Sequence, residues 1–346
     1  MSLLTTTLGR ITLKNPLIAG SAEHLIEAEG IRRALKAGVG AVIVKSVNES
    51  ESARDQLQRA EYMLFDEHWN PVPWGPNAPA SAFIACRSGL TPQSFDEWLQ
   101  QTIQMDCEAK TYDSYAIPSV ILANLDTTVQ MAKQIEQAGL RALELNIGTP
   151  YATLARGHVS TEFDPNNVSA IVSTVRKAIS LPLWVKITGQ SERVPDLAAA
   201  AFAAGGDAVV MAGRSLGLIP DIETLEPIFG TTLGVGGFWN LPLTCQWLAL
   251  SRAKLGPDKP LIGTNGAQSG LDIARMMLAG ASAVEMTSNV MIRGAKTLSS
   301  ALAEFEAYLK RKSLKAIDLI GVAADRRSTF PDRPLQTNNW KKYVTT

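Results

Sequence analysis

Residues 181–213, LPLWVKITGQSERVPDLAAAAFAAGGDAVVMAG, contain an apolar run, a polar turn, an alanine-rich segment and a second apolar run. Continuous apolar runs of about 4–8 residues are typical of strands buried on both faces, as in parallel sheets. The segment therefore predicts a strand–helix–strand unit, with strands at 183–188 and 207–212 and a helix at 194–203.

The same unit recurs along the chain. Apolar runs predict eight strands, at 17–21, 41–46, 119–124, 142–147, 183–188, 207–212, 260–264 and 283–287. Helical patterns lie between most of them, at 28–37, 95–110, 127–138, 168–178, 194–203, 273–279 and 295–310. This alternation predicts an α/β fold of the (β/α)8 TIM-barrel type, with a doubly wound open sheet as the alternative.

Three segments make the chain longer than a minimal barrel. An insertion, Val47–Gly89, follows the second strand, and another, Gly213–Asn240, follows the sixth. A polar tail, Ser313–Thr346, ends the chain. Because no linker rich in Gly and Ser divides the sequence, we expect a single domain over 1–346, with the barrel at about 15–310 and an extension at 311–346.

Composition excludes several classes of function. The 33 Lys and Arg residues balance 33 Asp and Glu residues, which argues against a nucleic-acid or anionic-membrane partner bound mainly by charge. The three cysteines and three histidines are scattered, so we expect no metal centre and no iron–sulfur cluster. No apolar run reaches the ~18 residues of a membrane span, and a cytoplasmic protein is expected.

Polar side chains follow several predicted strands. Lys45 and Lys186 end the second and fifth strands, and Asn124 and Asn146 end the third and fourth. In a barrel these ends meet at one face, where active sites lie. A buried ammonium needs an anionic or electron-rich partner. The alternatives are a lysine that reaches solvent or one that pairs with a structural carboxylate.

Glycine turns and hydroxyls follow strands seven and eight. Gly263–Gly266 follows the seventh strand, Thr287 and Ser288 follow the eighth, and Gly234–Gly237 offers a second loop of close approach. Barrels build phosphate sites at these positions, although plain turn geometry is the alternative. A phosphate together with lysine charge beside a planar group indicates FMN as the cofactor.

Several motifs, in order and spacing, resemble one known family. They are Asn15–Ile18, Gly40–Ser46, Glu144–Asn146, Val185–Ile187 and Gly263–Ser288. Together they resemble the dihydroorotate dehydrogenase family of FMN-binding barrels, which includes the flavin domain of dihydropyrimidine dehydrogenase. The resemblance covers about Leu4–Lys310 and implies an FMN enzyme of pyrimidine-type metabolism that forms a homodimer.

The resemblance and the glycine turns assign residues to the FMN site. Lys45 is expected to touch both flavin and substrate, and Lys186 is expected beside the flavin N1/O2 edge. The full set of expected cofactor contacts is Ala19, Gly20, Lys45, Ser46, Asn124, Asn146, Lys186, Gly236, Gly237, Gly263, Asn265, Gly266, Thr287 and Ser288.

Departures from the family pattern concern the substrate. Thr149 stands where the family has its catalytic Cys or Ser, and a threonine is a poor base unless activated. Its alternative role is to cap a turn. Residues 211–214 replace the family's Asn-Ser/Thr pair, and 86–90 replace part of its amide clamp, which argues against dihydroorotate itself.

The expected substrate contacts are Asn146, Arg87, Ser88, Gly89 and Arg214. The two arginines suit a carboxylate or another anion, or they are ordinary surface residues.

The polar segment Tyr151–Phe163 is expected to act as a lid that carries His158, a proton donor or acceptor. The alternative is a solvated loop histidine.

Three functions compete. The leading one is an FMN-dependent oxidoreductase that moves hydride between flavin N5 and a C–C or C=C bond next to a carbonyl of a small cyclic amide or carboxylate. A flavin-free lyase or isomerase on a phosphorylated substrate, with a Schiff base on Lys186 or Lys45, is the second. A catalytically silent flavin-binding subunit is the third. The sequence offers no Rossmann fingerprint in a suitable context, so a diffusible molecule or a separate subunit must exchange electrons.

Overall fold

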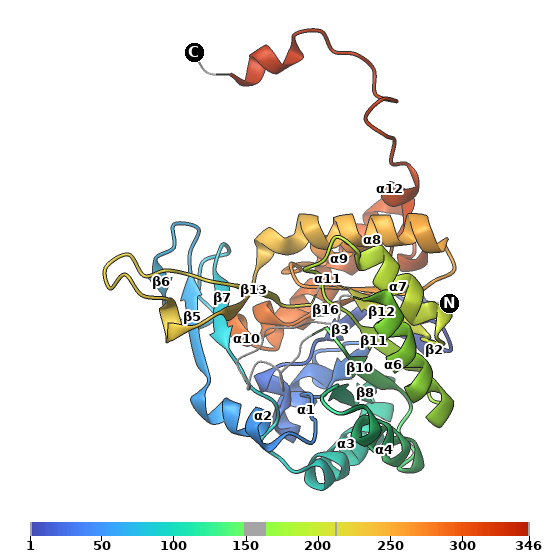
Figure 1. Ribbon diagram of the computed structural model, residues 1–346. Coiled ribbons are helices and arrows are strands. Elements are labelled where there is room, and N and C mark those ends of the chain that lie inside the picture. The colour runs from blue at the N-terminus through green and yellow to red at the C-terminus, as the bar shows by residue number, and fades with distance from the viewer. Residues whose placement is uncertain (1, 149–163, 212, 345–346) are drawn as a thin grey trace.

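The computed structural model describes residues 2–148, 164–211 and 213–344, and its centre is a parallel barrel (Figure 1). The strands are hydrogen-bonded in the order β8-β4-β3-β16-β15-β12-β11-β10-β9. Their bounds are β3 Leu17–Ala19, β4 Ala41–Ile43, β8 Tyr115–Ile117, β9 Ser119–Ile121, β10 Leu143–Asn146, β11 Leu183–Lys186, β12 Ala208–Met211, β15 Leu261–Thr264 and β16 Ala281–Met286.

Pro118 divides the third barrel strand into β8 and β9. A proline has no N–H to donate to a neighbouring strand, so the ladder is interrupted there. β8 pairs with β4 and β9 pairs with β10, which closes the sheet around the barrel. The predicted (β/α)8 fold is confirmed, but its third strand begins at Tyr115, before the predicted start at Ser119.

Helices surround the barrel (Figure 1). The larger ones are α1 Ala28–Lys36, α3 Phe95–Lys110, α4 Leu125–Gln137, α6 Pro165–Ala178, α7 Val194–Ala203, α8 Leu241–Leu255, α9 Gly270–Leu278 and α11 Lys296–Lys312. Seven of them match the predicted helices to within three residues at each end. Helix α8 was not predicted, because its apolar side chains do not gather on one face.

Short elements complete the fold. They are the helices α2 Glu51–Asp55, α10 Ser288–Arg293 and α12 Val322–Asp325, and the 3-10 helices η1 Glu23–Leu25, η2 Gln56–Arg59, η3 Ile228–Gly230, η4 Phe238–Asn240, η5 Ala316–Leu319 and η6 Asn339–Tyr343.

A hairpin closes the amino end of the barrel. It consists of β1 Thr6–Leu8 and β2 Ile11–Leu13, which pair antiparallel. Leu8, Ile11 and Leu13 pack with inward-facing strand residues, including the fully buried Trp184. The barrel interior is therefore apolar at this end, which leaves the carboxyl end for polar groups.

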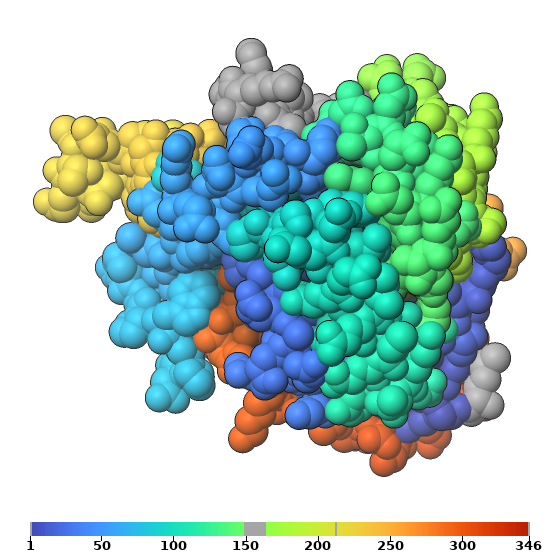
Figure 2. Space-filling view, turned by 90° about the horizontal axis from the view of Figure 1, so that it is seen from below, coloured from blue at the N-terminus to red at the C-terminus, as the bar shows by residue number. Residues whose placement is uncertain are grey.

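The two insertions form one antiparallel sheet, which the sequence analysis did not predict. Its strands are β5 Glu61–Phe65, β6 Pro71–Val72, β7 Phe83–Arg87, β13 Ser215–Gly217 and β14 Leu233–Gly236. β7, from the first insertion, pairs with β14, from the second. Figure 2 shows that these blue and yellow segments project from one side of the barrel.

The C-terminal extension begins against the barrel helices. Arg252 on α8 makes two hydrogen bonds of 2.7 Å to the carboxylate of Asp325, at the end of α12. Beyond α12 the chain runs away from the barrel (Figure 1). None of the described helices is both long and apolar enough to cross a membrane.

Asp106 joins α3 to the barrel. This buried carboxylate accepts hydrogen bonds from the Ala116 backbone N–H at 3.0 Å and from the Arg141 guanidinium at 2.6 and 2.8 Å. Arg141 also lies over the ring of Tyr115. A single side chain therefore holds a helix, a strand and the loop before β10 together.

We expect Asp106→Ala to lower the free energy of unfolding by about 2–4 kcal/mol, because it leaves a partly buried guanidinium and a strand N–H without their acceptor. Urea unfolding followed by circular dichroism measures this value. Glu29→Ala is the control, since it breaks only the exposed Glu29–Arg33 pair and should cost less than about 0.5 kcal/mol. Equal losses in the two variants would contradict the proposed role of Asp106.

Candidate active site

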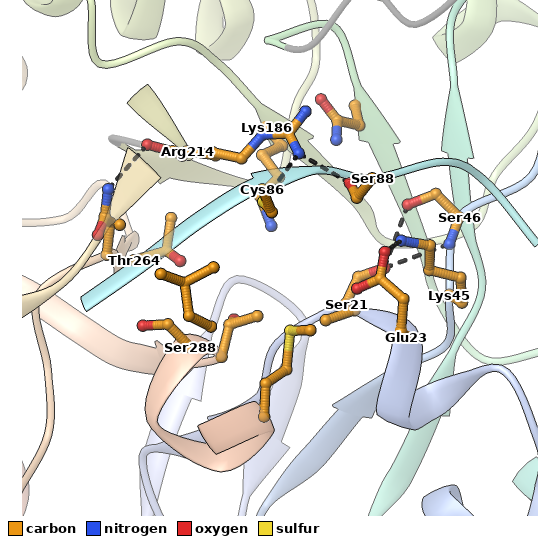
Figure 3. Close-up of a pocket in the computed structure, with 18 of the residues that line it drawn as sticks. Ser21, Glu23, Lys45, Ser46, Cys86, Ser88, Lys186, Arg214, Thr264 and Ser288 are labelled. Atoms are coloured by element: carbon orange, nitrogen blue, oxygen red, sulfur yellow. Dashed lines mark hydrogen bonds and ion pairs between the residues drawn. The ribbon is translucent and has the colours of Figure 1, made fainter. Parts of the chain in front are cut away.

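A cavity of about 870 Å³, including space open to solvent, lies at the carboxyl ends of the barrel strands (Figure 3). Residues that end or follow β3, β4, β10, β11, β15 and β16 form its floor, and β7 and β14 of the insertion sheet form a wall. The expected site residues that line it are Lys45, Ser46, Ser88, Asn146, Lys186, Arg214, Gly236, Asn265, Thr287 and Ser288.

Lys186 lies between two buried glutamates. Its ammonium is 2.7 Å from Glu285 Oε2 and 3.5 Å from Glu144 Oε2. Burial opposes the charge of Lys186, but the two carboxylates raise the pKa of this lysine above its ordinary value. Burial raises the pKa of Glu144 from 4.5 to about 7, the ammonium lowers it, and the charge of Glu285 adds to the rise. Lys186 is therefore held as a fixed cation in the floor of the cavity.

Lys45 pairs with a different carboxylate. Its ammonium donates to Glu23 Oε1 at 2.9 Å, and its backbone carbonyl accepts a hydrogen bond from the Trp98 indole at 2.8 Å. Burial alone would raise the pKa of Glu23, but the charge and hydrogen bond of Lys45 lower it to about 2. The two lysines of the site are thus both charged and both anchored by glutamate.

Three serines connect these regions. Ser46 Oγ lies 3.2 Å from Ser21 Oγ and 2.9 Å from Ser119 Oγ. Ser119 then donates a hydrogen bond of 2.7 Å to Glu144 Oε1. Ser21 and Ser46 line the cavity, so this chain runs from the cavity to the buried carboxyl group.

The opposite end of the cavity carries small and neutral polar residues. Figure 3 shows Ser288 and Thr264 there, away from Lys45 and Glu23. Asn265 has a positive φ of 70° and donates a hydrogen bond of 3.4 Å to the Gly213 carbonyl. Gly20 packs directly against the Thr287 hydroxyl, where any Cβ would collide.

Arg214 reaches the wall of the cavity. One of its guanidinium nitrogens donates to Ser88 Oγ at 2.8 Å and lies 3.7 Å from Cys86 Sγ (Figure 3). A Cβ on Gly234 would collide with the Arg214 side chain, so glycine in β14 provides the room for it. Burial raises the pKa of Cys86, which keeps this thiol neutral.

Comparisons with known proteins identify the family. The sequence profile described as dihydroorotate dehydrogenase matches residues 67–309. This chain belongs to the dihydroorotate dehydrogenase family. It is 26% identical over 325 residues to the dihydroorotate dehydrogenase B (NAD(+)) catalytic subunit of Methanocaldococcus jannaschii, with 93% of this chain and 98% of that protein covered.

Two further relatives carry related names. The corresponding catalytic subunit of Methanocella arvoryzae is 28% identical over 322 residues, with 92% of this chain and 97% of that protein covered. The dihydroorotate dehydrogenase A (fumarate) of Lactobacillus helveticus is 30% identical over 165 residues, which are 47% of this chain and 52% of that protein. The chain is thus a member of a family of oxidoreductases.

The structure does not bring every expected residue of this dihydroorotate dehydrogenase family member to the cavity. The Arg87 guanidinium pairs with Glu61 at 2.8 Å and donates to the Arg59 carbonyl, away from the cavity lining. Asn124 caps α4 through a bond to Thr127 N–H. Gly89 packs against Leu57 instead.

Four more of the expected contacts are packed into the structure around the cavity. Ala19 is buried in the core shared with the helices, and Gly263 contacts Met276 on α9. Gly237 packs on Phe83, and Gly266 packs on the backbone of Leu241. Thr149 and His158 lie outside the described residues, and their roles stay predictions.

The carboxylates that pair with the lysines were not predicted from the sequence. Glu23 was not identified as a site residue, and Glu144 and Glu285 were read only as parts of strands. A signal for the latter two was present, because residues two apart on a strand share a face. Glu144 is two residues before Asn146, and Glu285 is two before Thr287. Among the described residues, no group of three or more His, Cys, Asp or Glu could hold a metal ion.

We expect Glu23→Gln to lower the stability most at neutral pH. A native pKa of about 2, against an ordinary 4.5, gives the native state stability that is present above pH 4.5 and is lost as the pH falls toward 2. The shift corresponds to about 3 kcal/mol. Urea unfolding of both proteins at pH 7 and near pH 3.5 measures the difference, which should shrink at the lower pH.

Glu61→Gln is the control for this experiment, because the Arg87–Glu61 pair is half exposed and should contribute less than about 1 kcal/mol. A stability difference for Glu23→Gln that is independent of pH would contradict the assignment of the ion pair.

Proposed function

We propose that this chain is an FMN-dependent oxidoreductase of the dihydroorotate dehydrogenase type. It would move hydride between flavin N5 and a C–C or C=C bond next to a carbonyl of a small cyclic amide or carboxylate. The observation that carries the proposal is the fixed ammonium of Lys186 at the floor of a cavity whose far end is built from Asn265, Thr287 and Ser288.

The residues of the cavity fit FMN. A Cβ on Gly236 would come to 3.3 Å from the Asn265 side chain, so glycine leaves room for that amide beside the cavity. Gly236, Asn265, Thr287 and Ser288 would hold the phosphate end. When bound, FMN would supply the two-electron hydride chemistry that no side chain offers.

Lys186 would act by electrostatics. It is held in place by Glu144 and Glu285 before any ligand arrives, so it needs little reorganisation to stabilise negative charge. A Schiff base requires the neutral amine, and the carboxylates oppose that form of Lys186. The lyase alternative is therefore less well supported. The silent-subunit alternative differs from our proposal only in turnover, which substrate-driven reduction tests.

Arg214 and Ser88 would orient the substrate. A guanidinium donates up to five hydrogen bonds and suits a carboxylate or another planar anion. The substrate class that follows is a small anionic carbonyl compound. Thr149 or His158 would handle the proton, and this remains a prediction.

The names of the relatives bear on assembly. Two of the relatives are called catalytic subunits, which implies a separate subunit in those proteins. We propose a separate electron-transfer partner for this chain as well, together with the homodimer, cytoplasmic location and single domain over 1–346 expected from the sequence.

The purified protein should be yellow, with one FMN per chain identified by the mass of the released chromophore. Ser288→Ala should weaken FMN binding about tenfold to a hundredfold, the value of a hydrogen bond to a charged group. Fluorescence titration of the apoprotein measures this affinity. Ser299→Ala, on α11 and outside the cavity lining, is the control. A colourless protein that does not take up FMN would refute the proposal.

Arg214→Ala should raise KM for an anionic substrate about tenfold to a hundredfold and change kcat little, because it removes a contact present before and during the reaction. Steady-state reduction of an artificial acceptor, with a panel of carboxylated and neutral dihydro-amides, measures this. Arg87→Ala should change KM less than about twofold, since its guanidinium pairs with Glu61. Equal effects of the two substitutions would refute the assignment of Arg214.

A further inference from the structure

Six polar side chains form a continuous chain of contacts inside the carboxyl end of the barrel. In order along it they are Ser21, Ser46, Ser119, Glu144, Lys186 and Glu285. They lie on or just after β3, β4, β9, β10, β11 and β16. The chain of contacts thus joins the buried ion cluster of Lys186 to the two serines that line the cavity.

The hydrogen bonds from Ser46 to Glu144 have a defined direction. Ser119 donates its one hydroxyl proton to Glu144 Oε1, so the hydrogen bond between Ser46 and Ser119 must be donated by Ser46. Ser21 donates its own proton to the Val44 carbonyl at 3.2 Å, so Ser46, which lines the cavity, is free to accept a proton from water there. The hydroxyls of Ser46 and Ser119 are thus oriented so that a proton moves from the cavity toward the Glu144 carboxyl group.

The charges around Glu144 do not balance when both glutamates are ionised. Among the residues that the structure describes, the titratable groups that face it are Lys186 on β11 and Glu285 on β16, and the neighbouring strand β9 contributes the hydroxyl of Ser119. Both carboxylates are essentially fully buried, and among the described residues Glu285 Oε1 has no hydrogen-bond partner, while the Lys186 ammonium, 3.5 Å away, is the one group facing Glu144 Oε2. The other charged groups of the cavity floor, Lys45 and Glu23, already pair with each other.

Two buried carboxylates and one ammonium leave one negative charge in excess, which is costly in a low-dielectric interior. A proton on one carboxyl group removes that cost. Ser119 supplies the route to Glu144, and burial raises the pKa of Glu144 to about 7, so the proton is exchanged near neutral pH.

We propose that Glu144 is a positioning residue that takes up and releases a proton through Ser119 and Ser46, and so sets the net charge that the Lys186 cluster presents to the cavity. With Glu144 ionised the cluster of Lys186, Glu144 and Glu285 carries one negative charge, and with Glu144 protonated it is neutral. The inference rests on the proposed function in that FMN is the group facing Lys186.

The step is balanced. Bound FMN would supply the two-electron chemistry, and one proton passes from solvent through the hydroxyls of Ser46 and Ser119 to a carboxylate oxygen of Glu144. An O–H bond forms at Glu144, each serine gives up one proton and receives another, and no other oxidant or reductant is needed. The proton on Glu144 would thereby offset negative charge gained by a group bound beside Lys186.

The reduction potential of the bound FMN tests this inference. One extra proton taken up per two electrons changes the equilibrium constant of reduction by a further factor of ten per pH unit. For a two-electron couple this adds about 30 mV per pH unit to the slope of the reduction potential. We expect this extra slope in the wild type near pH 7 and its absence in Glu144→Gln. Dye equilibration between about pH 5.5 and 8.5 measures it. Glu136→Gln, a surface substitution on α4, should keep the wild-type slope.

Infrared spectra of the cofactor-free protein give a second readout. The wild type should show the C=O band of a protonated carboxyl group that disappears as the pH rises through about 7, and Glu144→Gln should lack it. Ser119→Ala removes a hydrogen bond that favours the ionised form, so it should move the transition upward by about 0.5–1 pH unit. This variant keeps the inference testable if Glu144→Gln does not fold.

Two results would overturn the inference. One is an ionised Glu144 throughout this pH range, and the other is the same potential slope in the wild type and Glu144→Gln. Failure of the protein to bind FMN would instead refute the proposed function, while the infrared titration would still decide the protonation of Glu144.

Discussion

The ion pair between Lys186 and Glu285, with Glu144 beside it, is the constraint on which the rest of the site depends. A charge placed inside a barrel is stable only if partners replace the water that it loses. The glutamates do this from β10 and β16, on different sides of the barrel interior. The position of the ammonium is therefore fixed by the closed barrel. The ion cluster forms only when β10 and β16, at the two ends of this chain segment, are both assembled in the barrel.

The barrel interior divides into two halves along its axis. The β1–β2 hairpin and residues such as Trp184 fill the amino half with apolar side chains, so the interior there gains stability from burial. The polar groups lie in the carboxyl half, where the strands end and the cavity begins. Trp184 and Lys186 are only two residues apart on β11, so one strand contributes to both halves.

The sequence was informative wherever the relevant signal is local. Alternating apolar runs predicted the barrel, and the rule that active sites lie at strand ends predicted Lys45, Lys186, Asn146 and the residues after β15 and β16. The sequence did not predict features that depend on contacts between segments distant in the chain. The pairing of β7 with β14 joins residues more than a hundred positions apart, and no local pattern announces it. The carboxylate partner of Lys186 could not be predicted for the same reason, since Glu285 comes from a strand that is distant in the sequence.

Arg87 and Arg214 illustrate the difference. Both were candidates for the substrate, yet Arg87 lies on β7 between Cys86 and Ser88, which line the cavity. Side chains alternate between the two faces of a strand, so the middle residue points away from the cavity. The direction of the Arg87 side chain therefore follows once its segment is known to be a strand. Arg214 precedes β13 instead and reaches across β14, because Gly234 has no side chain to block it.

The wall and the floor of the cavity belong to different parts of the architecture. The floor residues are built into the closed barrel, whereas the wall is made only of the two insertions, which add to the barrel without contributing a strand to it. Substitutions in the wall therefore leave the barrel ladder and the buried ions intact. A change of substrate preference can evolve in the insertions alone, while the chemistry at the floor stays under the separate constraint of charge balance.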